Sequence, residues 1–141
     1  MEINELRVGN YVNYNGLNLE VYSFENRYPR SEKRYDNTVL VDLLFDGFIT
    51  AILHEVKGIP LTEEILLNCG FEKINHINGY SFYSFNRKSL KDMNAYMPLY
   101  IYLNPNCTKL ANFTVQQNVE YVHQLQNLFY AINGKELNIN L

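Results

Sequence analysis

Arginine, lysine and tyrosine alternate in a polar stretch between residues 25 and 37, and a second basic group follows at residues 87–91. Guanidinium and ammonium groups bind phosphates, and tyrosine rings stack on bases, so this combination is typical of nucleic-acid recognition. If both groups lie on one side of the molecule, they form one binding patch for RNA or for a partner. The candidate residues are Arg27, Tyr28, Arg30, Lys33, Arg34, Tyr35, Arg87, Lys88 and Lys91.

Acidic residues in the same stretch favour a simpler interpretation. Glu25, Glu32 and Asp36 offset three of its four basic charges, and Pro29 interrupts any regular element. An exposed, solvated loop is therefore favoured over a binding site. The net charge of −3 also argues against bulk electrostatic attraction to nucleic acid.

Histidines and cysteines do not form a recognisable metal or catalytic motif. His54, His76 and His123 are far apart in the sequence, and neither Cys69 nor Cys107 belongs to a CxxC pair. Cys69 falls in the last turn of a predicted helix, where the negative end of the dipole raises a thiol pKa and makes a poor nucleophile. On these patterns we expect no metal site and no disulfide.

Paired carboxylates occur at Glu63 and Glu64, where the capping of a helix accounts for them. The chain has no glycine-rich phosphate loop, no GxSxG and no HExxH. We therefore expect a protein that is not an enzyme and that holds no cofactor.

The composition predicts one folded domain. With 141 residues, of which 47% are hydrophobic and 19% charged, the chain can bury a core of its own. Its 12 tyrosines and 8 phenylalanines favour β-strands or an interface. The first residues do not resemble a signal peptide, and no apolar run is long enough to cross a bilayer. A cytoplasmic protein is the expectation.

Residues 1–60 are expected to form a β-rich subdomain. Apolar and polar residues alternate in 6–12 and 17–24, on either side of a turn that contains Asn15 and Gly16. Two more β-rich runs, 38–45 and 48–53, flank Asp46 and Gly47, so the sequence predicts two hairpins. A small antiparallel barrel of the SH3-like kind and an open sheet both fit this pattern.

Residues 61–141 are expected to form a helix, an antiparallel sheet of three to four strands and a C-terminal helix, which makes the whole chain α+β. Thr62 is the predicted cap of the first helix, with Leu61 and Leu66 as its hydrophobic staple and Gly70 as its end. The predicted strands are 73–77, 80–85, 99–103 and 110–115.

A second amphipathic helix is predicted from residue 119 to its glycine stop at Gly134, covering the sheet. Its apolar stripe contains Val122, Leu125, Phe129 and Ile132. The residues predicted to face away from the sheet are Glu120, His123, Gln124 and Asn127.

Three segments carry a resemblance to a known family: ELRVGNYV at residues 5–12, GIPLTEEILLNCGF at 58–71 and YVHQLQNLFYAINGKEL at 121–137. They resemble short accessory proteins of phages, prophages and mobile elements in Bacteroides- and Flavobacterium-type bacteria. That family shares an LRxGN start, a PLTEE helix and a VHQLQNLYFAL-type ending. The three segments cover about a quarter of the chain, and no catalytic or ligand role is attached to them.

The resemblance implies a setting and a class of activity. Small proteins of phage accessory regions often bind a host machine and block it, as anti-CRISPR proteins do. We therefore expect a non-enzymatic inhibitor of a bacterial defence effector, such as an RNA-guided CRISPR nuclease, that acts in the host cytoplasm. Its partner would be a host protein or ribonucleoprotein. The alternative is a nucleic-acid-binding accessory or regulatory protein that uses the basic residues at 25–37.

Overall fold

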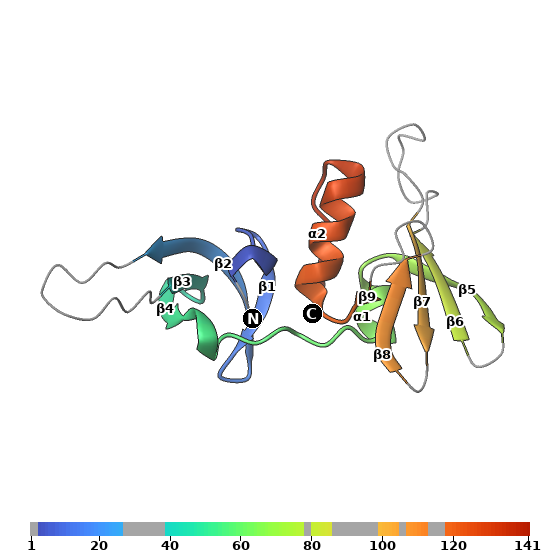
Figure 1. The fold of residues 1–141 in the computed structure, drawn as a ribbon, viewed down its shortest axis with the longest axis horizontal. Coiled ribbons are helices and arrows are strands. Elements are labelled where there is room, and N and C mark those ends of the chain that lie inside the picture. Colours follow the sequence, from blue (N-terminus) through green and yellow to red (C-terminus); the bar gives the residue numbers. More distant parts are fainter. Residues whose placement is uncertain (1–2, 27–38, 78–79, 86–98, 105–106, 113–117) are drawn as a thin grey trace, which may run out of the picture. The chain divides into compact units, whose positions relative to one another are not determined.

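The computed structural model describes residues 3–26, 39–77, 80–85, 99–104, 107–112 and 118–141 (Figure 1). The chain divides into two compact units, Met1–Ile59 and Pro60–Leu141, referred to below as unit 1 and unit 2. Unit 1 contains a four-stranded antiparallel sheet, and unit 2 contains a five-stranded antiparallel sheet with two α-helices. The predicted α+β class is therefore confirmed.

Unit 1 begins with a short 3-10 helix, η1 (Ile3–Glu5), and ends with a second, η2 (Leu53–Glu55). Between them lie β1 (Tyr11–Tyr14), β2 (Leu17–Asn26), β3 (Val39–Leu44) and β4 (Phe48–Ile52). The strands pair in sequence order, and no pairing between β1 and β4 closes the described residues into a barrel. Of the two predicted arrangements, the structure has the open sheet.

Both predicted hairpins are confirmed, and their turn residues explain them. Asn15 and Gly16 have φ angles of 51° and 84°, the left-handed pair that a two-residue hairpin turn requires. Asp46 and Gly47 also have positive φ, between β3 and β4. The first strand starts at Tyr11 and not at Leu6, because the chain turns first: the Asn10 side chain accepts a hydrogen bond from the Arg7 amide at 2.9 Å.

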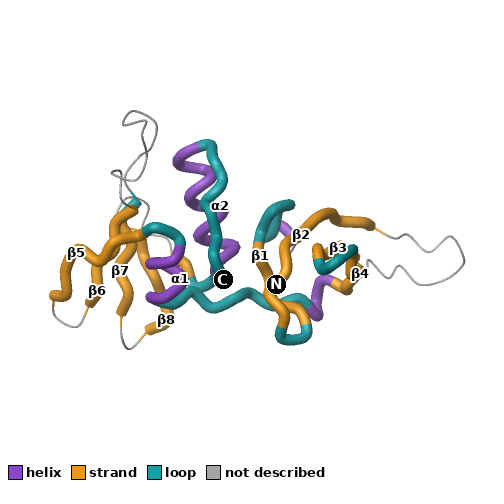
Figure 2. Tube along the Cα trace, turned by 180° about the vertical axis from the view of Figure 1, so that it is seen from behind, coloured by secondary structure: helices purple, strands orange, loops and turns teal. Residues whose placement is uncertain are grey.

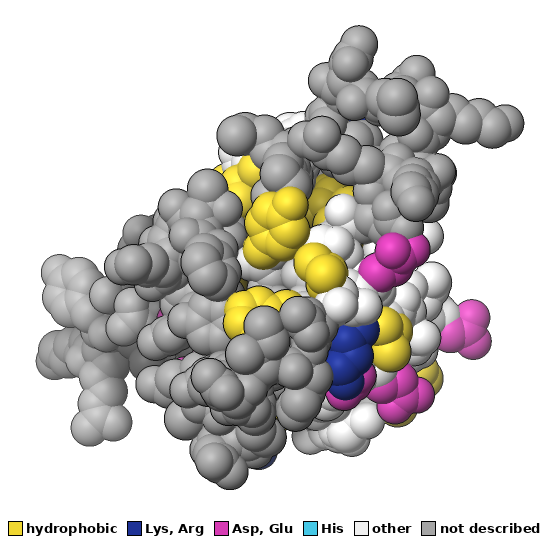
Figure 3. All heavy atoms as spheres, turned by 90° about the vertical axis from the view of Figure 1, so that its right-hand side faces the viewer, with side chains coloured by type: hydrophobic (Ala, Val, Ile, Leu, Met, Phe, Trp, Pro, Cys, Tyr) yellow, Lys and Arg dark blue, Asp and Glu magenta, His cyan; other side chains and the backbone are white. Residues whose placement is uncertain are grey.

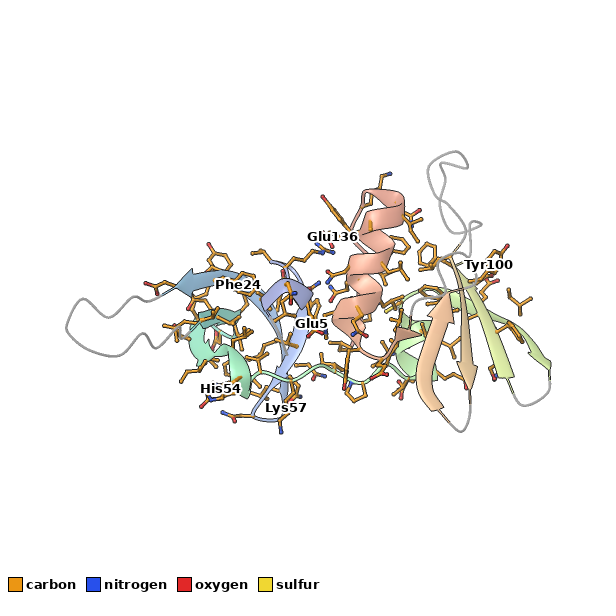
Figure 4. The ribbon with its side chains drawn as sticks, viewed as in Figure 1. Glu5, Phe24, His54, Lys57, Tyr100 and Glu136 are labelled. Atoms are coloured by element: carbon orange, nitrogen blue, oxygen red, sulfur yellow. The ribbon has the colours of Figure 1, made fainter. Side chains whose placement is uncertain are left out.

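The core of unit 1 lies on one face of its sheet, the inner face, and consists of aliphatic residues. Phe24 on β2 packs against this core (Figure 4), as do Tyr14, Ile49 and Leu53. Strand β1 is further held by paired backbone hydrogen bonds of 2.8 Å between Asn13 and Lys57. The buried members of the core are Leu6, Val12, Leu19, Val21, Val41, Leu43, Ala51 and Val56.

Unit 2 is a β-meander with a helix at each end of its sequence. Helix α1 (Glu63–Asn68) precedes β5 (Phe71–Ile77), β6 (Tyr80–Phe85), β7 (Tyr100–Asn104), β8 (Cys107–Asn112) and β9 (Asn118–Val119), and helix α2 (Val122–Asn133) follows. Neighbouring strands pair antiparallel in sequence order. Figure 2 shows β5, β6, β7 and β8 side by side. The sheet has one strand more than predicted, and β8 begins at Cys107 instead of Leu110. Residues 113–115 of that predicted strand lie outside the described residues.

Helix α1 has the predicted ends. The Thr62 hydroxyl accepts a hydrogen bond from the Ile65 amide at 3.3 Å, and Gly70 has a φ of 90°. Leu61 and Leu66, the predicted staple, are both buried. The C-terminal tail is tied to the end of this helix, because the Asn140 side chain donates to the Asn68 carbonyl.

Helix α2 begins at Val122, later than predicted, because Val119 belongs to β9 and pairs with Leu110. The helix ends as predicted at Gly134, which has a φ of 65° and donates to the Tyr130 carbonyl. It packs on the sheet through Phe129, whose ring meets that of Phe85 edge-on at 4.9 Å. Phe85 in turn contacts Phe71, so three rings join α2, β6 and β5.

The buried side of α2 includes polar side chains in addition to the predicted apolar stripe. His123 was expected to face away from the sheet, but it is only 1% exposed, with its ring stacked on Tyr121. Gln126 is buried as well, and Gln124 and Asn127 are half-buried. The expectation of a solvated polar face was therefore wrong for His123. No helix in the described part of the chain is long and apolar enough to cross a membrane.

Candidate interaction surface

The nine residues predicted from the sequence as a binding patch all lie outside the described residues. Arg27, Tyr28, Arg30, Lys33, Arg34 and Tyr35 precede β3, and Arg87, Lys88 and Lys91 follow β6. Whether the two basic groups share one side of the molecule therefore stays a prediction. The described residues present a different surface, on the sheet of unit 1.

A β-bulge at Tyr22 sets which residues of β2 reach that surface. Val21 pairs with Leu43, but the next pair is Ser23 with Asp42, so Tyr22 is the extra residue. Such a bulge shifts the alternation of side chains by one position. Val21 and Phe24 both lie on the inner face, and Tyr22 and Ser23 follow each other on the opposite one.

We call this opposite face of the sheet the outer face. Cross-strand pairing arranges it in three rows that reach β3 and β4, and Asn13 with Asn18 forms a further row on β1 and β2 alone. The first row is Tyr11, Glu20, Leu44 and Phe48, the second is Tyr22 with Ser23, Asp42 and Thr50, and the third is Glu25, Leu40 and Ile52.

Exposed apolar side chains gather on the outer face and at the adjoining turn. Tyr22 is 51% exposed and Phe48 61%, yet their rings contact each other at 4.6 Å between centroids. Because β3 lies between their strands, the two rings meet over β3, where Leu44 is Phe48's cross-strand partner. Phe45, which is 49% exposed, lies in the adjoining turn, next to Leu44 in the sequence. We call Tyr22, Leu44, Phe45 and Phe48 the apolar cluster.

The turn after β3 begins with the exposed residue Phe45 and has a defined backbone geometry. The Phe45 amide donates to the Gly47 carbonyl at 3.0 Å, which closes the three residues 45–47 into a tight loop. Gly47 has a φ of 127°, which side-chain-bearing residues rarely adopt. The geometry therefore holds an aromatic residue at the hairpin tip.

Asp42 is the polar centre of the outer face. One of its carboxylate oxygens accepts a hydrogen bond from the Ser23 hydroxyl at 2.6 Å, and the other accepts from the Thr50 hydroxyl at 2.7 Å. Both donors stand opposite Asp42 on the neighbouring strands, so the carboxylate is held in one orientation. Charged acceptors make hydrogen bonds that are stronger than neutral ones.

A second acidic residue, Glu20, lies in the first row beside Tyr11. Burial raises the pKa of Tyr11, and the Glu20 carboxylate raises it further by its charge and by accepting a hydrogen bond from the phenol. Tyr11 therefore favours its neutral form, and its phenol donates to Glu20 on the outer face.

Unit 2 offers a polar cluster that ties α1 to the sheet. Lys73 on β5 forms an ion pair of 2.8 Å with Glu63 and lies 5.8 Å from the centre of the Tyr83 ring. The hydrogen bond to Glu63 raises the pKa of Lys73, and burial raises that of Tyr83. Both shifts move titration further from neutral pH, so these groups suit a structural role better than acid–base chemistry.

Unit 2 also exposes apolar residues, but each comes from a different segment. Figure 3 shows hydrophobic side chains at the surface on one side of the molecule, with a basic side chain next to acidic ones. Scattered exposure of this kind is normal for a folded protein. The residues are Leu67, Ile74, Tyr100, Tyr130 and Leu141; Tyr100 is labelled in Figure 4.

The candidate metal and thiol groups form no site in the described part of the chain. No three histidines, cysteines or carboxylates are grouped there as metal ligands. The Cys69 thiol is buried, and burial raises its pKa, whereas the dipole was the cause predicted from the sequence. A protonated, buried thiol is a poor nucleophile.

No protein-family model, curated protein or solved structure matches this chain.

Sequence reasoning missed the residues of the apolar cluster. One signal could have indicated them: Leu17, Leu19 and Val21 alternate with polar residues, but the aromatic residues Tyr22 and Phe24 that follow fall on the opposite phase. A bulge at Tyr22 returns Phe24 to the inner face, and it leaves the ring of Tyr22 on the outer face.

Proposed function

We propose that this chain is a non-enzymatic binding protein and that a partner protein docks on the outer face of unit 1. The contact between the exposed rings of Tyr22 and Phe48 is the observation that carries the proposal. Removing such rings from water is favourable by roughly 25 cal/mol for each Å² of apolar surface, and the entropy cost of association offsets part of that gain.

The arrangement of the cluster distinguishes it from ordinary exposure. Single exposed apolar side chains are common, but contiguous exposed patches mark interaction sites. Tyrosine and phenylalanine are enriched at the centres of interfaces, where a few anchors supply most of the affinity. The bulge and the turn hold this cluster outside, so it is a built feature of the hairpins.

The resemblance to phage accessory proteins supplies the class of partner. We propose that the partner is a bacterial defence effector, such as an RNA-guided CRISPR nuclease, and that docking blocks a surface the effector needs. A small domain can inhibit in this way without any chemistry of its own.

A nuclease assay tests both parts of the proposal. Purified wild-type protein is added to a guide-loaded CRISPR nuclease from a Bacteroides-type host, and target cleavage is measured. We expect inhibition by the wild type, and a requirement for about tenfold more of a Tyr22→Ala/Phe48→Ala variant. Val8→Ser, a change at an exposed apolar residue away from the strands, is the control. Unchanged cleavage with the wild type would refute the effector, and full inhibition by the double variant would refute the face.

Gel shifts on a short structured RNA test the alternative of nucleic-acid binding. If the basic residues hold RNA, replacing Arg27, Arg30 and Arg34 by alanine weakens binding strongly. The affinity also falls steeply with salt, by about one unit of log–log slope for each phosphate contact. A wild type that binds no RNA at micromolar concentration leaves a protein as the target.

A further inference from the structure

The charge of the outer face indicates the chemistry of its partner. Glu20, Glu25 and Asp42 lie on the face, and Asp46 lies in the adjoining turn. The described residues from β1 to β4 include no lysine, arginine or histidine. Over all of its described residues, unit 1 has six acidic side chains against one arginine, Arg7, one lysine, Lys57, and one histidine, His54.

The apolar cluster and the fixed carboxylate occupy the same surface. Tyr22 directly precedes Ser23, which donates to Asp42, and Phe48 lies two residues from Thr50, which donates to the other oxygen. Two aromatic rings in contact thus stand beside a negative charge of defined orientation.

This arrangement suits one kind of side chain in particular. A guanidinium group is planar, so it can stack on an aromatic ring and at the same time donate two hydrogen bonds to a carboxylate. An ammonium group satisfies the charge but stacks less well. Phosphates and acidic peptides meet repulsion from the four carboxylates.

We propose that the outer face binds a segment of the partner protein that presents arginine next to an apolar side chain. The arginine pairs with Asp42 and stacks on the Tyr22–Phe48 rings, and the apolar neighbour packs on Leu44. The inference rests on the proposed function, since it names the chemistry of the partner at that same docking face.

Peptide titrations followed by amide NMR shifts test the proposal on the full chain. The probes are nine-residue peptides with a central Arg-Leu-Arg, Lys-Leu-Lys or Glu-Leu-Glu in the same neutral flanks. We expect the arginine peptide to shift amides of β2, β3 and β4, the lysine peptide to bind more weakly and the glutamate peptide not to bind. Asp42→Asn and Phe48→Ala should each weaken the arginine peptide by about tenfold, and Val8→Ser should leave it unchanged.

Several outcomes would overturn the arginine partner. These are equal binding of the glutamate peptide, shifts confined to residues outside β2–β4, or unchanged affinity in both Asp42→Asn and Phe48→Ala. If Asp42→Asn fails to fold, Phe48→Ala still tests the proposal, because the Phe48 side chain is exposed and its loss should not disturb the fold. A dimer of the wild type that Phe48→Ala dissociates would assign the face to a second copy of the chain.

The two proposals fail separately. If no peptide binds but the Tyr22→Ala/Phe48→Ala variant still loses nuclease inhibition, the docking face stands and the arginine chemistry is wrong. If the arginine peptide binds at the outer face and the nuclease is not inhibited, the chemistry stands and the effector is wrong.

Discussion

The bulge at Tyr22 places two consecutive side chains on the outer face of unit 1 while Val21 and Phe24 both remain on the inner face. Strict alternation after Val21 would bury Ser23 and expose Phe24. The extra residue avoids that and brings Ser23 opposite Asp42. One inserted position thus creates both the ring contact and the fixed carboxylate.

Gln124 is a second residue whose role was not evident from the sequence: its side chain caps the start of α2. Its side-chain oxygen accepts hydrogen bonds from the amides of Glu120 at 2.7 Å and Tyr121 at 3.2 Å, at the start of α2. Gln124→Ala leaves these donors without that acceptor, so we expect a loss of about 1 kcal/mol in the free energy of unfolding. Gln124→Glu keeps an acceptor at the positive end of the helix and should cost less. Urea unfolding measures both, and equal losses would contradict the capping role.

Tyr11 makes stability depend on pH in the alkaline range. Its pKa in the folded protein lies above the ordinary value of 10.0, because burial and then Glu20 favour the neutral phenol. A group whose pKa is raised by folding contributes stability below its unfolded pKa, and that stability is lost as pH rises through the folded value. Tyr11→Phe should therefore flatten the fall in unfolding free energy above about pH 10. Tyr130→Phe, an exposed site on α2, is the control, and an equal effect of both variants would refute the assignment.

Helix α2 is held to the sheet of unit 2 by Phe129. That ring is 1% exposed and meets Phe85 edge-on. Phe129→Ala should lower the free energy of unfolding by about 3–5 kcal/mol, since it leaves a cavity beside the ring of Phe85. Tyr130→Ala, at the exposed neighbouring position, should change it by less than about 0.5 kcal/mol. Thermal or urea unfolding of both variants decides whether the helix packs through this residue.

Turn and cap residues made the elements predictable from sequence. Asn15 and Gly16 predicted the first hairpin, Thr62 the start of α1, and Gly134 the end of α2, because each acts within a few residues of itself. The start of α2 was missed because Val119, in β9, pairs with Leu110, in β8. No local sequence pattern encodes that pairing. The burial of His123 was missed for a related reason: a side chain's surroundings depend on tertiary packing.

The candidate surface could not be predicted from local sequence patterns. It needs β2, β3 and β4 in one register, and it combines residues from positions 20 to 50. Basic clusters are visible in a sequence, whereas an exposed ring pair is not, since tyrosine and phenylalanine in a strand are more often buried. The bulge in β2 determines that Tyr22 lies on the outer face, and the sequence alone does not reveal that bulge.

The division into two units predicts how the chain unfolds. The core of unit 1 is formed by residues from Leu6 to Val56, all of its own. Leu43→Ala, at a fully buried position in that core, should destabilise unit 1 by about 2–5 kcal/mol and lower the urea midpoint of its amide NMR signals. The signals of unit 2 should keep their midpoint. Leu66→Ala, equally buried in unit 2, should give the reverse pattern. If either substitution lowers the midpoints of both units together, the chain unfolds as one cooperative domain, as its length alone would suggest.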